Sequence, residues 1–398
     1  MTSLVLGGAL AACAPTPSSL PAPTISGGPV LEPWTRAVTG SAEQAATIVV
    51  LGDSVSEGYG IEDHLERRWV DRLQRGLRRR ADVPGCRTSA GGFHGTTSVV
   101  PADYRAESLP DPVTTGEVTP LADEGPGGRA VQLGPDGTIT WRVDARSVDV
   151  GYRTRPDGGV LRVEIDARTA VQGLAVDTRT DEPSERRVWS SGDLGPGTHT
   201  VTVRHAGDPA GAEGRLGGAP VTVTDLVPFR GDRGRCVHVH DASQTGVQAQ
   251  TIARTPTYLA DSLALDPDLL LVPLGFNDAR AGVGPADFGR VLDRLIAQIR
   301  AQGYAGPVLL VGWFTPGWGD ELPAWSDYLD QMEQRTEHEG VSFLDLSAVL
   351  PPVAGAADGV YLDRLHPGPE GQVLIAESLL EVLAPRGDLD PDREPARD

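Results

Sequence analysis

Short apolar runs that alternate with amphipathic stretches constrain the fold of this chain more than any other feature of its sequence. The first run covers residues 47–51, and the apolar side chains of residues 67–80 then recur at helical spacing on one face. The same alternation returns later, with apolar runs at 237–240, 269–274, 307–312 and 341–346 and helical patterns at 288–301, 325–339 and 370–383. Such alternation predicts a parallel sheet with helices on both faces.

A different pattern separates these two blocks. Between about residues 105 and 232, glycine and proline are dense, and short segments alternate apolar and polar residues between turn clusters. Period-two alternation predicts antiparallel strands, and a series of such strands favours a sandwich. We therefore predict an α/β domain in two parts, 45–104 and 233–384, interrupted by an inserted antiparallel β-sandwich domain at 105–232. The charged, proline-rich segment 385–398 is predicted to be a disordered tail.

Charge and composition exclude several functional classes. Thirty-five basic residues against fifty-five acidic residues give a formal net charge of −20, and a field of that sign repels phosphate backbones and anionic headgroups. The chain contains no lysine, which excludes Schiff-base and P-loop lysine chemistry. No apolar run approaches the roughly 18 to 20 residues that cross a bilayer. We expect neither a nucleic-acid partner nor a membrane-spanning segment.

The N-terminus resembles that of a bacterial lipoprotein. An apolar stretch at 4–10 runs into Ala11, Ala12 and Cys13, and proline and serine are frequent in the residues that follow. The resemblance implies a signal peptide with a lipobox at 1–13, a lipid on Cys13 and a flexible tether at 14–44. We expect an exported protein, either a cell-surface lipoprotein or secreted, that touches the membrane only through this anchor. A short apolar tail with an incidental cysteine is the alternative.

Cys86 and Cys236 are the two remaining cysteines. They bracket the predicted insertion, in a chain that is expected to reach an oxidising compartment. We predict a disulfide between them. Two buried thiols are the alternative.

Polar residues stand where the predicted strands end. Ser54 follows the first strand, Asn277 follows the strand at 269–274, and His366 precedes the last helix with Asp363 three residues before it. Sites in open α/β sheets gather outside the carboxyl ends of the strands. A serine, a histidine base with an orienting carboxylate and an amide donor are the groups that nucleophilic acyl transfer needs. Ser54 alone, or Asn277 with Asp278 alone, would more often be a helix cap, but caps explain neither the order nor the convergence of these residues with Asp363 and His366.

These motifs resemble those of the SGNH or GDSL family of serine hydrolases. Gly52-Asp53-Ser54 is similar to the family's first block, residues 275–278 to its third and residues 363–366 to its last, and Gly246 is the best match to the single glycine of its second block. The Glu57-Gly58 and Arg68-Trp69 pairs resemble exported bacterial members with an inserted β-domain. The resemblance implies a three-layer α/β/α, flavodoxin-like hydrolase domain.

The resemblance also implies a role for each matching residue. Ser54 would attack an ester carbonyl, His366 would take the serine proton, and Asp363 would orient the imidazole. The backbone N–H groups of Ser54 and Gly246 and the side-chain amide of Asn277 would stabilise the oxyanion. Water would then resolve the acyl-enzyme, so we expect neither a metal nor an organic cofactor.

Two further sets of residues have both a functional and a structural interpretation. Trp313, Phe314 and Trp318 follow the strand at 307–312 and are predicted to line an acyl or sugar pocket, with core packing as the alternative. His238 and His240 point to one side of a strand, but a metal site needs at least one more ligand, and we expect none.

The sequence therefore predicts an exported serine esterase. The expected substrate is an acyl ester, short-chain such as acetyl, on a carbohydrate or cell-envelope polymer. A lipase, lysophospholipase, thioesterase or O-acyltransferase would use the same residues. A surface glycan-binding protein on a catalytically silent hydrolase scaffold is the alternative from another class. The sequence does not separate these, and it leaves open the acyl length, the role of the insertion and the oligomeric state.

Overall fold

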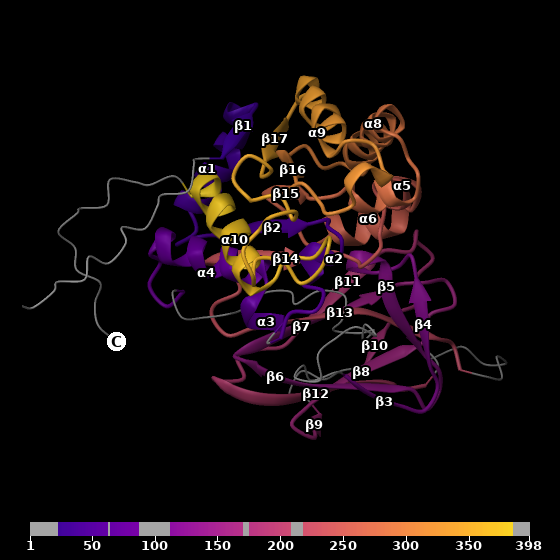
Figure 1. The fold of residues 1–398 in the computed structure, drawn as a ribbon. Coiled ribbons are helices and arrows are strands. Elements are labelled where there is room, and N and C mark those ends of the chain that lie inside the picture. The colour runs from indigo at the N-terminus through magenta and orange to yellow at the C-terminus, as the bar shows by residue number, and fades with distance from the viewer. Residues whose placement is uncertain (1–22, 63, 87–111, 170–174, 208–217, 385–398) are drawn as a thin grey trace, which may run out of the picture.

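The computed structural model describes residues 23–62, 64–86, 112–169, 175–207 and 218–384 (Figure 1). These residues form an α/β part and a β-sandwich, which lies beneath the α/β part in Figure 1. The predicted signal peptide with Cys13, the first residues of the predicted tether and the predicted tail 385–398 lie outside the described residues.

A six-stranded sheet forms the centre of the α/β part, in the order β1-β17-β16-β15-β2-β14. Five of its strands are parallel: β2 (Ala46–Val50), β14 (Val237–Asp241), β15 (Leu269–Val272), β16 (Val308–Gly312) and β17 (Val341–Asp345). Numbered along the chain, their order is 2-1-3-4-5, which is flavodoxin-like and reverses between β2 and β15. The apolar runs in the sequence predicted all five.

Helices cover both faces of this sheet, which gives the three predicted layers (Figure 1). One face carries α1 (Glu32–Thr39), α4 (Trp69–Ala81) and α10 (Pro369–Leu383), and the other carries α5 (Ala249–Arg254), α8 (Pro285–Ala301) and α9 (Trp325–Gln334). Shorter helices are α2 (Ser54–Glu57), α3 (His64–Arg67), α6 (Pro256–Leu263) and α7 (Phe276–Arg280). No helix in the described part of the chain is both long and apolar enough to span a bilayer.

Residues 23–44 fold against the α/β part, so the tether predicted at 14–44 is wrong for this stretch. β1 (Thr24–Ser26) pairs antiparallel with β17, which makes the sheet mixed where a parallel one was predicted. Trp34 in α1 is fully buried, and its Nε1 donates to the carbonyl of Leu383, 2.9 Å away. The proline content concealed this helix, although Pro33 in its first turn is compatible with a helix start.

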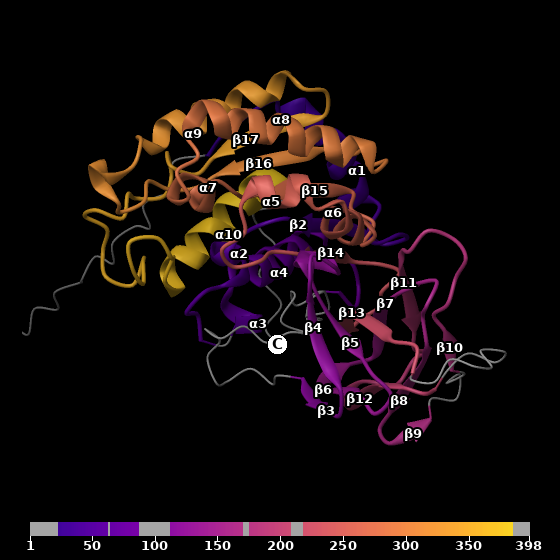
Figure 2. The same cartoon turned by 90° about the vertical axis from the view of Figure 1, so that its right-hand side faces the viewer.

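The sandwich consists of two antiparallel sheets between residues 113 and 229. The sheet nearer the α/β part in Figures 1 and 2 has the order β11-β7-β13-β5-β4, and the farther one the order β10-β8-β12-β6-β3, with β9 beside β8. Alternate side chains point into the core between them, as in β8, because the sequence alternates apolar and polar residues. The near sheet contains β4 (Val118–Ala122), β5 (Arg129–Leu133), β7 (Ser147–Arg153), β11 (Arg186–Ser190) and β13 (Val221–Phe229). The far sheet contains β3 (Val113–Thr115), β6 (Thr138–Ala145), β8 (Val160–Ile165), β9 (Arg168–Thr169), β10 (Val176–Asp177) and β12 (Gly197–His205).

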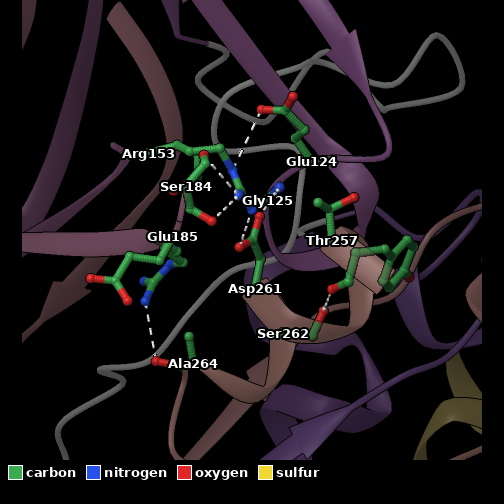
Figure 3. A network of polar contacts seen from close by, with 12 residues as sticks. Glu124, Gly125, Arg153, Ser184, Glu185, Thr257, Asp261, Ser262 and Ala264 are labelled. Atoms are coloured by element: carbon green, nitrogen blue, oxygen red, sulfur yellow. Dashed lines mark hydrogen bonds and ion pairs between the residues drawn. The ribbon is translucent and has the colours of Figure 1, made fainter. Parts of the chain in front are cut away.

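A disulfide joins the two segments that flank the sandwich, and a buried polar network holds the sandwich to the α/β part. Cys86, after α4, is bonded to Cys236, just before β14, which is the predicted pair. In Figure 3, Arg153 of the sandwich points to Asp261 of α6 and forms an ion pair with it. Asp261 also accepts a hydrogen bond of 2.7 Å from the backbone N–H of Gly125. Both charged side chains are almost fully buried, so this contact fixes the sandwich against α6.

We predict that Trp34→Ala lowers the free energy of unfolding by about 3 to 5 kcal/mol, because it empties a large buried site and leaves the Leu383 carbonyl unpaired. The matched variant Trp34→Phe keeps an aromatic ring and loses the hydrogen bond, and we expect a loss of roughly 1 to 2 kcal/mol. Urea denaturation measures both. A Trp34→Ala variant as stable as the parent would show that residues 23–44 contribute nothing to the folded unit.

Candidate active site

Ser54 stands at the turn from β2 into α2. Asp53 caps this short helix, and its carboxylate accepts a hydrogen bond of 3.0 Å from the backbone N–H of Val55. Ser54 is buried, and its Oγ lies 3.0 Å from Nε2 of His366. The strand end and the helix cap thus aim the hydroxyl at an imidazole more than 300 residues away in sequence.

Asp363 holds the imidazole of His366 from the other side. Its Oδ2 lies 2.8 Å from Nδ1 of His366, and its Oδ1 accepts hydrogen bonds from the backbone N–H groups of Leu365 and His366. Burial alone would raise the pKa of Asp363, but the hydrogen bonds from the His366 side chain and the two N–H groups outweigh it and hold that pKa below its usual value. An ionised carboxylate only accepts, so Nδ1 carries the proton and Nε2 presents its lone pair to Ser54.

Tyr59 packs against the same imidazole, a contact that the sequence analysis missed. The two ring centroids are 4.1 Å apart and the ring planes differ by 24°, a stacked arrangement. The backbone N–H of Tyr59 donates to the carbonyl of Ser54, because Gly58 ends α2 in the left-handed conformation and turns the chain back. The sequence signal that could have indicated this contact is an aromatic residue that directly follows the turn containing Ser54.

Gly246 and Asn277 lie together beside this turn. Gly246 belongs to residues 242–248, which follow β14 and are called here the Gly246 loop. Asn277 donates from Nδ2 to the carbonyl of Val247 over 3.0 Å, and the second hydrogen of that amide is left for another acceptor. On the other side of Gly246, the backbone N–H of Thr245 donates to Glu57 of α2 over 2.6 Å. Gly246 has a φ of 79°, a conformation that favours glycine.

Asp53 and Asp278 are buried carboxylates that hold backbone in place. Burial raises the pKa of Asp53 to about 7 and that of Asp278 to about 6. Asp278 accepts hydrogen bonds from the backbone N–H groups of Ala249 and Gln250 at the start of α5. Both residues therefore support the turns that present Ser54 and the Gly246 loop.

A pocket of about 560 Å³ opens beside His366 and Asp363. Three of its other lining residues are charged and three are apolar: Arg280, Glu321, Arg364, Trp318, Leu322 and Leu365. The pocket thus offers a mixed polar and apolar surface beside the imidazole that contacts Ser54.

The prediction that Trp313 and Phe314 line a pocket with Trp318 is wrong for the first two residues. Trp318 does line the pocket, but Trp313 and Phe314 are fully buried in the α/β core. Trp313 meets the ring of Trp69 edge-on, and Phe314 packs against Phe276. The first residues after β16 still lie between the two helical layers, so their side chains pack into the core. The chain reaches the rim of the sheet only after these residues.

His238 and His240 lie on β14, outside the Ser54 site. Nδ1 of His238 is 2.9 Å from a guanidinium nitrogen of Arg78, and Nε2 is 3.2 Å from the carbonyl of Arg233. Among the described residues, no group of three or more histidine, cysteine, aspartate or glutamate side chains is arranged to hold a metal ion.

Comparisons with known proteins identify the family to which this chain is similar. The model of the GDSL-like lipase/acylhydrolase family matches residues 210–374, which include Gly246, Asn277, Asp363 and His366, while Ser54 precedes the matched stretch. An arylesterase of Vibrio mimicus is 30% identical over 154 residues, which are 38% of this chain and 72% of that protein.

One solved structure shares the fold at low sequence identity. A peptidoglycan O-acetylesterase structure aligns with a TM-score of 0.62 at 17% identity and covers 90% of this chain and 97% of its own. A family two carbohydrate esterase from Cellvibrio japonicus covers 69% of this chain and 99% of its own at 13% identity, but its TM-score of 0.30 is too low to relate the two folds.

We predict that Tyr59→Ala lowers the kcat of ester hydrolysis about 2- to 10-fold, because loss of ring stacking frees the imidazole to leave the Ser54 hydroxyl. Tyr59→Phe keeps the ring and is expected to retain a kcat closer to that of the parent than Tyr59→Ala. Steady-state kinetics on an acetyl ester compare the three proteins. Equal kcat in Tyr59→Ala and parent would contradict an orienting role for the ring.

Proposed function

Because the chain belongs to the GDSL-like lipase/acylhydrolase family and is a serine ester hydrolase, we propose that it removes short acyl groups, acetyl above all, from a carbohydrate or cell-envelope polymer, with Ser54, His366 and Asp363 as its catalytic triad. The observation that carries this proposal is the continuous hydrogen-bonded line from Ser54 Oγ through the imidazole to Asp363, with steps of 3.0 and 2.8 Å.

The proposed reaction has two halves. Ser54 Oγ attacks the ester carbonyl while Nε2 of His366 takes the hydroxyl proton, and the imidazolium then gives that proton to the leaving alcohol. Water attacks the acyl-enzyme with the same imidazole as base, which releases the acid and restores the serine. Asp363 stays ionised and stabilises the imidazolium, consistent with its lowered pKa.

The oxyanion of each tetrahedral intermediate needs donors that are already in position. We assign this role to the backbone N–H groups of Ser54 and Gly246 and to the free hydrogen of the Asn277 amide. The amide is held by its bond to Val247, so it need not reorient when charge develops. One such donor is worth roughly 3 to 4 kcal/mol of transition-state stabilisation.

The pocket beside His366 supports a polar alcohol and a short acyl group. Arg280, Glu321 and Arg364 contribute charged groups to its lining, and a long acyl chain placed there would take their water away without replacing it. A sugar presents hydroxyl groups that can bond to such a surface. The pocket therefore favours a carbohydrate ester over a lipid.

The shared fold supports a polymer of the cell envelope. The peptidoglycan O-acetylesterase structure covers 90% of this chain, and the uncovered tenth is much shorter than the sandwich, so the likeness extends into the sandwich. An exported form held through Cys13 would bring the site to such a polymer.

We predict that the protein without residues 1–22 hydrolyses a chromogenic acetyl ester faster than the octanoyl ester. Ser54→Ala and His366→Ala should each lower kcat by roughly a thousandfold or more, because the first removes the nucleophile and the second removes the base that activates it. Thermal unfolding of each variant serves as the folding control. An inactive parent across acetyl to octanoyl esters, or activity that survives Ser54→Ala, would refute the mechanism.

The polymer is tested by acetate release from O-acetylated peptidoglycan and from O-acetylated xylan. We expect the parent to release acetate from at least one of them and Ser54→Ala to release none above background. Hydrolysis of the small ester without acetate release from either polymer would show that the natural alcohol is not one of these polymers.

A further inference from the structure

The Gly246 loop is joined to the sandwich through a buried carboxylate. Glu57, three residues after Ser54 in α2, has no exposed surface. Its Oε2 accepts hydrogen bonds from the backbone N–H of Thr245 over 2.6 Å and from the Thr245 hydroxyl over 2.8 Å. Its Oε1 accepts a hydrogen bond of 2.6 Å from Nη1 of Arg129, the first residue of β5 in the sandwich.

The ion pair between Glu57 and Arg129 is sensitive to the loss of either charged group. A buried carboxylate is costly unless a cation and hydrogen bonds compensate it, and Arg129, only 15% exposed at its side chain, supplies a cation. Removal of the guanidinium takes this cation away from Glu57 and favours uptake of a proton or entry of water. Either change weakens the bonds by which Glu57 holds Thr245, the neighbour of Gly246.

The turn before Arg129 is itself fixed in place. It forms η3 (Pro126–Gly128), and the backbone N–H of Gly127 donates to the Ser262 hydroxyl of α6. A Cβ on Gly128 would lie 2.4 Å from the ring of Tyr258, so this close approach requires glycine. The Tyr258 hydroxyl donates to the carbonyl of Ala242, the first residue of the Gly246 loop, over 2.8 Å. The sandwich thus meets the loop both through Glu57 and through Tyr258.

We propose that Arg129 is a positioning residue of the esterase: through Glu57 and Thr245 it holds the Gly246 N–H where the oxyanion forms. The sandwich is then a structural part of the oxyanion site, in addition to any polymer that it contacts. This inference rests on the proposed function, because it assigns to the Gly246 N–H the role of an oxyanion donor.

A purely structural link between the two parts would behave differently. It would lower the stability of the variants and leave each folded molecule as active as the parent. A positioning role changes turnover and transition-state binding while ground-state binding stays the same. The matched control is Arg153, which also joins the sandwich to the α/β part by a buried ion pair, with Asp261 of α6, and does not contact Glu57 (Figure 3).

The experiment compares parent, Arg129→Met, Arg129→Lys and Arg153→Met by kcat and KM on an acetyl ester, with active sites counted by a fluorophosphonate. The affinity for phenylboronic acid, which forms a tetrahedral adduct on serine, is measured on the same samples. We expect Arg129→Met to lose about 10- to 100-fold in kcat, as for a donor displaced by up to an ångström. KM should stay within about twofold, boronate affinity should fall with kcat, and Arg129→Lys should recover part of both.

The controls separate the possible results. Arg153→Met should lose stability and keep a kcat per active site within about twofold of the parent; Arg155→Met, whose guanidinium bonds to Glu124 in the same network, replaces it if it does not fold. An equal kcat loss in the control would overturn the proposal, as would unchanged kcat and boronate affinity in Arg129→Met.

If Arg129→Met does not fold, Thr245→Val removes one of the loop's bonds to Glu57, and unchanged kcat and boronate affinity in Thr245→Val would overturn the proposal. An inactive parent would refute the proposed function itself, whereas an active parent with an unaffected Arg129→Met would refute only this inference.

Discussion

The reversal of strand order between β2 and β15 is the constraint on which the site depends. At that point the crossovers on the two sides of the sheet run in opposite directions, so the loops after the two strands separate and leave a crevice at their carboxyl ends. Ser54 follows β2, and Asn277 follows β15. The Gly246 loop follows the outer neighbour β14 and reaches across to both. The topology of the sheet therefore brings together the proposed nucleophile and the two other proposed oxyanion donors.

Much of this could be predicted from sequence because its signals are local. A buried parallel strand has to be a short apolar run, and the polar residues that end such runs have to share one rim, which is how Ser54, Asn277 and His366 could be grouped. Asp363 could be added because three residues bring a carboxylate within one turn of the histidine. The same reasoning failed at Trp313 and Phe314, because a position just past a strand end can still lie between two helical layers, and periodicity does not report that depth.

The features that sequence could not predict depend on contacts between distant segments. Trp34 lies in a proline-rich stretch that reads as a tether, and only its contact with the end of α10, almost 350 residues later, makes that stretch part of the fold. Tyr59 meets His366 because two separate turns end at the same place. Arg129 reaches Glu57 from another sheet altogether. None of these pairs has a characteristic spacing in the sequence or belongs to a motif, because tertiary packing brings the two residues together.

The site at which the chain enters the sandwich explains why the sandwich can act on the Gly246 loop. The chain leaves the α/β part after α4 and returns at β14, and the Cys86–Cys236 bond ties the exit to the return. β14 is an edge strand, so the sandwich lies beside it without disturbing the sheet order. The loop after β14 is also the one that contains Gly246. The sandwich is thus adjacent both to the loop and, through Glu57, to the helix that starts at Ser54, and a single buried ion pair can couple it to the proposed chemistry.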